Sequence, residues 1–157
     1  MSIVENLQSI QQRIAAACDR SGRDPKEVQL IAVSKGHSAA NIREAADAGL
    51  TLFGENKVQE LKLKRGQCPG NLRWEFIGHL QTNKCRDAAY FSNMIHSVDS
   101  ERVAEALHIA CEKLATTLPV LLEVNISGEA TKYGFRPDEI LSKLLELNDY
   151  DRLEIHG

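Results

Sequence analysis

The chain has 157 residues, of which 43% are hydrophobic and 26% charged, and its formal net charge is -3. This length and balance are typical of one globular domain with a sizeable core. The slight negative charge gives no electrostatic reason to expect nucleic acid or an anionic membrane as a partner. No apolar stretch reaches the roughly 20 residues that span a bilayer, and the N-terminus lacks a secretory pattern, so we expect a cytoplasmic protein.

The cysteines and histidines give no indication of a metal site. The four cysteines are far apart and include no Cys-x-x-Cys pair: Cys18, Cys68, Cys85 and Cys111. This spacing argues against a zinc site or a disulfide framework and favours reduced thiols, with Cys18 and Cys111 as small core residues. The five histidines show no metal-ligand spacing either. The sequence therefore predicts no bound metal.

The first predicted element is an amphipathic helix over residues 2–20. Ser2, with Glu5 three positions later, forms a capping-box pattern, and Gly22 is suited to end the helix. Apolar residues recur at helical spacing: Ile3, Leu7, Ile10, Ile14 and Ala17. After a short turn, an apolar run predicts the first strand at residues 28–34.

Strand-like and helical patterns then alternate to the end of the chain. Apolar runs begin near Val28, Leu50, Leu72 and Met94, and helical patterns lie between them at 38–48, 56–65 and 82–91. There follow a helix from Ser100 to Glu112, a strand at 119–126, a polar loop at 127–135, a helix with Pro137 in its first turn, and a sixth strand at 153–157. Such alternation predicts an α/β fold whose parallel strands are joined by right-handed crossovers.

Two architectures fit this alternation: an open, doubly wound sheet and part of an eight-stranded barrel. A complete barrel typically takes about 250 residues, so the length favours the open sheet. No Gly-x-Gly-x-x-Gly pattern follows the first strand, so a dinucleotide-binding fold gains no support. The pattern alone leaves both architectures open.

The first predicted strand ends in Lys35. A lysine is not expected inside a buried strand, because removing its ammonium group from water is costly unless the charge is paired. The carboxyl end of a parallel strand, however, faces the region where α/β folds keep their sites. A partly desolvated amine there can form a Schiff base with an aldehyde. The alternative is a solvated lysine that opens an ordinary loop.

Polar residues also follow the other predicted strands, and in a parallel sheet these ends lie on one face. They include Asn56, Gln81, Asn83, His96 and Asn125. Helix capping is an equally good explanation for Asn56, Thr82 and Ser100, and His96 fits a satisfied strand histidine. Polar residues at five strand ends together favour a small-molecule site at that face.

Three segments carry a family resemblance. They are residues 32–35 (Ala-Val-Ser-Lys), 53–60 (Phe-Gly-Glu-Asn-x-x-Gln-Glu) and 74–84 (Trp-x-Phe-Ile-Gly-x-Leu-Gln-x-Asn-Lys). In order and spacing the chain resembles the pyridoxal phosphate homeostasis protein family, which is related to the N-terminal barrel of alanine racemase. The resemblance extends through 125–127 (Asn-Ile-Ser) and the loop that contains Lys132.

The resemblance implies a fold and a site. The fold is a partial (β/α)8 TIM-type barrel of the alanine-racemase N-terminal type, with about six parallel strands after an N-terminal helix. The resemblance also makes Lys35 the residue that forms the internal aldimine with pyridoxal 5'-phosphate (PLP), and it places Asn56 beside the cofactor. We place four more residues on the pocket wall: Gln81, Asn83, His96 and Asn125. Lys132 matches a loop lysine of the family.

The chain departs from the family pattern in two ways. Glu75 stands where the family often has histidine, and we expect it to lie outside the pocket. Family members also continue for roughly another half of this length, with the motifs that hold the cofactor phosphate. We therefore interpret residues 1–157 as a single PLP-binding barrel domain whose C-terminal part is missing, with weakened phosphate binding.

The main functional hypothesis is a carrier. It holds PLP on Lys35 and contributes to vitamin B6 homeostasis without turnover, with PLP-dependent enzymes as possible recipients. One alternative is an amino-acid racemase-like enzyme, which needs an acid/base pair at the cofactor ring. The other is an inert, truncated remnant.

Overall fold

Six parallel strands form one sheet in the computed structural model, which describes residues 2–157. They are β1 (Ala32–Val33), β2 (Leu52–Glu55), β3 (Arg73–Phe76), β4 (Met94–Val98), β5 (Leu118–Leu122) and β6 (Leu153–Ile155). Each strand pairs with the next strand in the chain. A doubly wound sheet would instead reverse its strand order at a switch point. The fold is therefore a partial barrel, and the open-sheet alternative is wrong.

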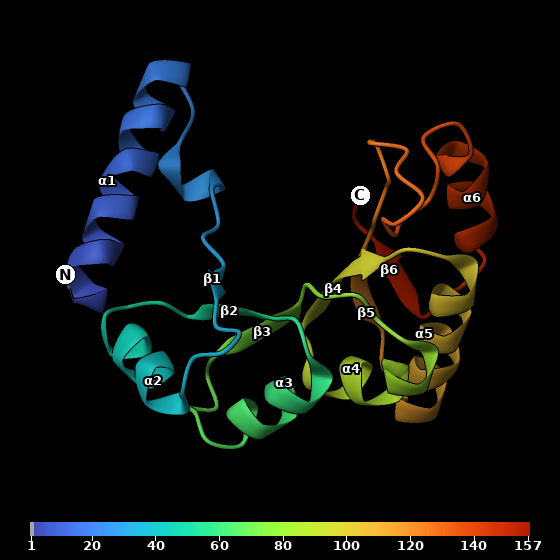
Figure 1. Ribbon diagram of the computed structural model, residues 1–157, viewed down its shortest axis with the longest axis horizontal. Helices are drawn as coiled ribbons and strands as arrows, with labels where there is room; N and C mark the ends of the chain where they lie inside the picture. Colours follow the sequence, from blue (N-terminus) through green and yellow to red (C-terminus); the bar gives the residue numbers. More distant parts are fainter. Residues whose placement is uncertain (1) are drawn as a thin grey trace.

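Helices precede and connect the strands. They are α1 (Ile3–Ser21), α2 (Ala39–Asp47), α3 (Val58–Arg65), α4 (Cys85–Phe91), α5 (Glu101–Leu114) and α6 (Ile140–Leu147), with short 3-10 helices η1 (Pro25–Glu27) and η2 (Thr82–Lys84). Figure 1 shows the strands as a curved band, with α2 to α6 following one another along its outer side. Crossovers of one hand produce this arrangement, because each connection then returns over the same face of the sheet.

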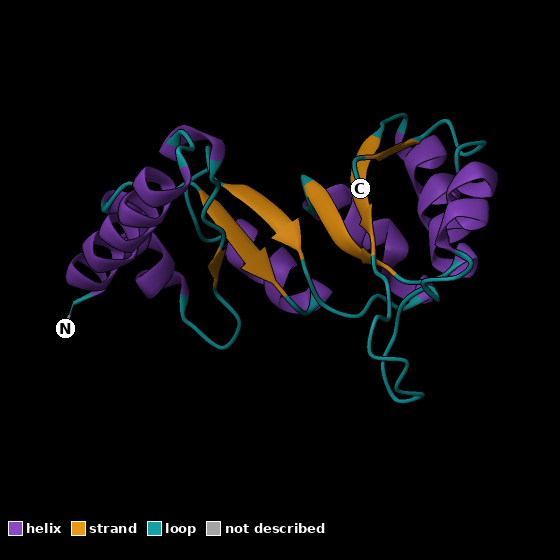
Figure 2. Ribbon diagram, turned by 90° about the horizontal axis from the view of Figure 1, so that it is seen from above, coloured by secondary structure: helices purple, strands orange, loops and turns teal. Residues whose placement is uncertain are grey.

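The N-terminal helix begins and ends as its sequence predicts. The Ser2 hydroxyl accepts the Glu5 N–H at 3.2 Å, and Glu5 Oε2 accepts the Ser2 N–H at 2.7 Å. Gly22 ends the helix in the left-handed conformation, with φ of 67°. Helix α1 packs against α2 and η1, beside the β1 edge of the sheet (Figure 2).

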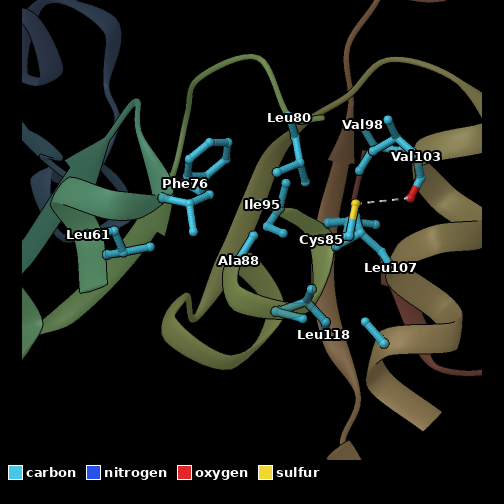
Figure 3. Packing of buried hydrophobic residues seen from close by; sticks show 14 of the residues in the cluster. Leu61, Phe76, Leu80, Cys85, Ala88, Ile95, Val98, Val103, Leu107 and Leu118 are labelled. Carbon is cyan, nitrogen blue, oxygen red and sulfur yellow. Dashed lines mark hydrogen bonds between the residues drawn. The ribbon is translucent and has the colours of Figure 1, made fainter. Parts of the chain in front are cut away.

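The core lies between the strands and the helices that cover them. Trp74 and Phe76 are two positions apart on β3, so their side chains point to the same face of the sheet. Both are buried. Figure 3 shows Phe76 near Leu61 of α3, and Ile95 near Ala88 of α4. Cys18 and Cys111 are buried, which confirms them as small core residues.

The predicted boundaries of three elements differ most from the structure. Strand β1 covers only two residues of the predicted range 28–34, because η1 forms just before that range and pairing with β2 begins only at Ala32. Helix α6 begins at Ile140, and Pro137 lies in the preceding turn, where the Glu139 carboxylate accepts the Arg136 N–H at 3.1 Å. Strand β5 ends at Leu122, after which Val124 forms an isolated bridge with Phe135.

Candidate functional site

Lys35 lies in a turn directly after β1, at the carboxyl end of the strand. The His37 N–H donates to the Ser34 carbonyl at 3.0 Å, and Gly36 adopts a left-handed conformation with φ of 75°. The Lys35 side chain is exposed, and no other group among residues 2–157 forms a hydrogen bond or ion pair with it. The turn therefore presents a primary amine without a protein partner.

A buried ion network lies beneath this turn. The Ser34 hydroxyl donates to Glu55 Oε1 at 2.7 Å, and Lys64 Nζ of α3 donates to the same oxygen at 2.6 Å. Lys64 Nζ also donates to Glu60 Oε2 at 2.8 Å. The sequence pattern gave no reason to place Lys64 in the site, because a lysine on a helix is normally solvated. Its spacing of four residues from Glu60 is the one signal that could have linked them.

Asn56 directly follows β2, which is the neighbour of β1 in the sheet. It therefore lies at the same edge of the sheet as the turn that carries Lys35. The Asn56 backbone packs closely against Gly78, where an added Cβ would lie 2.2 Å from the Asn56 carbonyl oxygen. Asn56 does not cap α3, because the N-cap residue is Lys57 and no side chain caps this helix. Asn56 Oδ1 is buried and has no hydrogen-bond partner. The capping explanation for Asn56 is therefore wrong, and its amide oxygen is free to accept from a ligand.

The other two capping candidates differ: Ser100 occupies an N-cap position and Thr82 does not. Ser100 is the N-cap of α5, but its hydroxyl donates to Asp99 Oδ1 at 2.8 Å and makes no cap bond. Thr82 is the first residue of η2, whose N-cap is Gln81. Helix capping therefore accounts for the position of Ser100, but not for Asn56 or Thr82.

A cavity of about 580 Å³ opens where the ends of β3 and β4 meet the loop at 127–135. Its lining includes two of the predicted pocket residues and the family's loop lysine: Gln81, Asn83 and Lys132. His79 stacks on Tyr133 with ring centroids 3.6 Å apart, and its Nδ1 lies 3.0 Å from Asp99 Oδ2. Lys35 and Asn56 do not line this cavity.

Asp99, which lines this cavity, affects the pKa of the neighbouring Glu123. Burial raises the pKa of Glu123, and the negative charge of Asp99 raises it further, while His79 opposes both effects. A carboxyl group with a raised pKa keeps its proton to higher pH than an exposed one.

His96 and Asn125 are engaged by neighbouring protein groups. His96 Nε2 lies 2.6 Å from Glu75 Oε2 on the adjacent strand. His96 is therefore a strand histidine with a protein partner, as the alternative to a pocket role predicts. Glu75 itself is buried and does not line the cavity. The Asn125 amide donates to the carbonyl of Glu129 at 2.9 Å, and its oxygen accepts the Gly128 N–H at 3.1 Å. Asn125 thus holds the 127–135 loop together.

Within residues 2–157, no helix is long and apolar enough to cross a membrane. In the same part of the chain, no three His, Cys, Asp or Glu side chains are grouped so as to hold a metal ion.

Comparison with known proteins identifies the family. The family described as alanine racemase, N-terminal domain, matches residues 5–157. The pyridoxal phosphate homeostasis protein of Pseudomonas aeruginosa is 39% identical over 157 residues, which cover 99% of this chain and 68% of that protein. A solved structure of PipY from Synechococcus elongatus with PLP bound superposes with a TM-score of 0.83 at 38% identity, covering 99% of this chain and 68% of PipY. Alanine racemase of Clostridium difficile shares only the fold, with a TM-score of 0.67 at 19% identity over 83% of this chain and 35% of that enzyme. The chain belongs to the pyridoxal phosphate homeostasis protein family, within the alanine racemase N-terminal fold.

Proposed function

We propose that this chain binds PLP through Lys35 and contributes to intracellular vitamin B6 homeostasis as a carrier without turnover. The observation that carries the proposal is the exposed, unpaired amine of Lys35 at the carboxyl end of β1. Support comes from the relatives that are named pyridoxal phosphate homeostasis proteins, and from PipY, whose structure contains PLP.

The residues at the ends of β1 and β2 fit this cofactor. Lys35 would hold PLP through its amine, and the cofactor would supply an aldehyde group that reacts with amines. Asn56 Oδ1, buried and unpaired, supplies an acceptor for a hydroxyl or protonated nitrogen at the same edge.

The remaining parts of the proposal concern the surroundings of Lys35. We propose that Gln81 and Asn83, which line the neighbouring cavity, form part of the pocket wall together with His96 and Asn125. We also propose that residues 1–157 act as one PLP-binding domain, that the protein is cytoplasmic, and that PLP-dependent enzymes are its recipients.

Reductive trapping tests the site. We expect that borohydride, added after incubation with PLP, attaches the cofactor to Lys35, as found by peptide mapping. Lys35→Ala should abolish both the label and the visible absorbance of the bound cofactor. Lys57→Ala is the matched control, because Lys57 is an exposed lysine after the neighbouring strand. No label on Lys35 in the wild-type protein would refute the proposal and leave the inert remnant.

Incubation with L-alanine tests the absence of turnover. We expect no accumulation of the D-enantiomer by protein that carries PLP on Lys35. Steady production of D-alanine, lost in Lys35→Ala, would replace the carrier assignment by a racemase-like enzyme.

A further inference from the structure

The turn that carries Lys35 is bonded on both sides to one helix. Lys64 Nζ of α3 donates to the Ser34 carbonyl at 2.8 Å, and the Gly36 N–H donates to Glu60 Oε2 at 3.2 Å. These two backbone groups belong to the residues immediately before and after Lys35. The ion network beneath the turn therefore bonds to the backbone on both sides of Lys35. This backbone determines the position of the Lys35 Cα atom.

Lys64 Nζ is fully paired at the centre of the network, whereas Glu55 Oε2 is buried without a hydrogen-bond partner among residues 2–157. An ammonium group has three N–H donors, and Lys64 uses them on Ser34 O, Glu55 Oε1 and Glu60 Oε2. The side chain of Lys64 is 8% exposed and that of Glu55 is fully buried. Two charges removed from water stabilise a fold little, because desolvation offsets most of their attraction. The arrangement is thus poorly explained by stability alone.

Lys64 remains a cation and does not compete with Lys35 for an aldehyde. Burial alone lowers the pKa of Lys64, but the hydrogen bonds to Glu55 and Glu60 outweigh it and raise that pKa. The pKa of Glu60 is lowered, chiefly by its hydrogen bond from Lys64 and then by that from the Gly36 N–H. Both partners therefore stay charged over the neutral pH range, and only an uncharged amine attacks a carbonyl carbon.

We propose that Lys64, Glu55 and Glu60, which we call the ion clamp, position Lys35 for attachment of the cofactor. The inference rests on the proposed function of Lys35. Lys64 and Glu60 are positioning residues, because they bond to the backbone on either side of Lys35. The clamp matters here because strand β1 is only two residues long and Gly36 has the conformational freedom of glycine, so neither holds the turn firmly.

Glu60→Ala is the primary test. It removes the acceptor of the Gly36 N–H, and the Glu60 side chain is 31% exposed, so the substitution leaves no buried cavity. Lys64→Met is less suitable, because it would leave Glu55 buried without its cation. Glu60→Gln is the conservative variant, which keeps an oxygen for the Gly36 N–H. Glu105→Ala is the control, because Glu105 is an exposed glutamate on α5 outside the clamp.

The measured quantity is the rate at which PLP attaches to Lys35, followed by the visible absorbance and by borohydride trapping. We expect Glu60→Ala to attach PLP about 10- to 100-fold more slowly, because a misplaced reacting group costs rate on this scale. Glu60→Gln should recover most of that loss and Glu105→Ala should match the wild type. A folded Glu60→Ala protein that attaches PLP at the wild-type rate would overturn the inference, as would a Glu60→Gln variant as slow as Glu60→Ala.

A second measurement separates the clamp from the function of Lys35. Hydrogen exchange of the Gly36 amide, in protein without PLP, should be faster in Glu60→Ala than in the wild type or Glu105→Ala. If the wild-type protein fails to label at Lys35, the proposed function fails, whereas the amide exchange still reports on the clamp. Unchanged exchange at Gly36 in Glu60→Ala would refute the clamp itself.

Discussion

Asn56 carries a buried polar atom without a hydrogen-bond partner among the described residues, as do Glu55, Ser92, His108 and Arg152. Buried polar atoms in proteins nearly always have a partner, because an unpaired one costs about 1–3 kcal/mol. Asn56 Oδ1 has none, while Asn93 Oδ1 accepts the Trp74 N–H at 2.8 Å. The two asparagines therefore represent opposite cases: one holds a strand in place, and the other keeps an acceptor open.

Replacement of Asn56 should separate binding from stability. We expect Asn56→Ala not to lower the free energy of unfolding, because no hydrogen bond is lost and the cost of the unpaired amide oxygen is removed. The same variant should bind PLP more weakly, as measured by titration of the visible absorbance.

Asn93→Ala is the contrasting variant. It leaves the Trp74 N–H unpaired, so we expect it to lower the free energy of unfolding by about 1–3 kcal/mol in denaturant titrations. If Asn56→Ala proves equally destabilising, Asn56 has a structural role that the hydrogen bonds do not reveal.

At the residue scale, the sequence predicted where the polar groups lie, but it did not predict which groups form hydrogen bonds with them. Lys35, Asn56 and the cavity residues lie at strand ends, as the alternation of elements predicts. Which groups pair with them depends on distances across the sheet, and single-chain patterns do not contain these. His96 is the clearest case, because its partner Glu75 lies 21 positions earlier and meets it only through β3–β4 pairing.

At the scale of elements, β2 and β3 are held together more closely at their ends than strand pairing alone requires. The Ile77 N–H donates to the Glu55 carbonyl at 2.9 Å, and the Gly78 backbone then packs against that of Asn56. The motif around Gly78 is thereby explained in physical terms, since any side chain there would displace the end of β2. Sequence patterning did not reveal this contact, because a close backbone approach leaves no periodic signal.

Gly78→Ala should therefore both destabilise the protein and weaken the site. We expect a loss of about 1–3 kcal/mol or more in the free energy of unfolding, since the Asn56 backbone must move to admit a methyl group. Thermal unfolding and PLP titration would measure the two effects. Gly70→Ala is the control, because nothing lies within 4 Å of a Cβ at Gly70. Equal stability of the two variants would contradict this account.

For the whole molecule, the strand order settled what the sequence pattern left open. Alternating elements predicted the parallel strands and their connecting helices, but they do not specify which strands are neighbours. The resemblance to the family supplied that information, and the structure confirms the partial barrel. The first strand was overpredicted because residues 28–31 are as apolar as a strand, and their lack of pairing depends on neighbours outside the segment.

The buried thiols make the whole core sensitive to alkaline pH. Burial raises the pKa of Cys85 to about 12 and that of Cys111 to about 11, from a usual value of 9.0. Above that usual value the unfolded chain loses thiol protons that the native core retains, so unfolding becomes more favourable as pH rises towards the native values. The raised pKa of Lys64 acts in the same direction at higher pH.

Thermal unfolding measured across alkaline pH tests this linkage. We expect the free energy of unfolding to fall above pH 9 by up to about 1.4 kcal/mol per pH unit for each buried thiol. The double variant Cys85→Ala and Cys111→Ala should show a shallower fall over the same range. An identical pH dependence in the variant and the wild type would show that other groups cause it.

The pairing of each strand with its successor has a consequence for how the chain folds. Paired residues are separated by only about 20 to 35 positions, from Ala32 with Phe53 to Leu118 with Leu153. The entropy lost in closing each of these connections is modest, and no pairing must wait for a distant part of the chain. A strand and helix can therefore join the growing sheet in the order in which the ribosome produces them, so the turn that holds Lys35 can form as soon as α3 has been made.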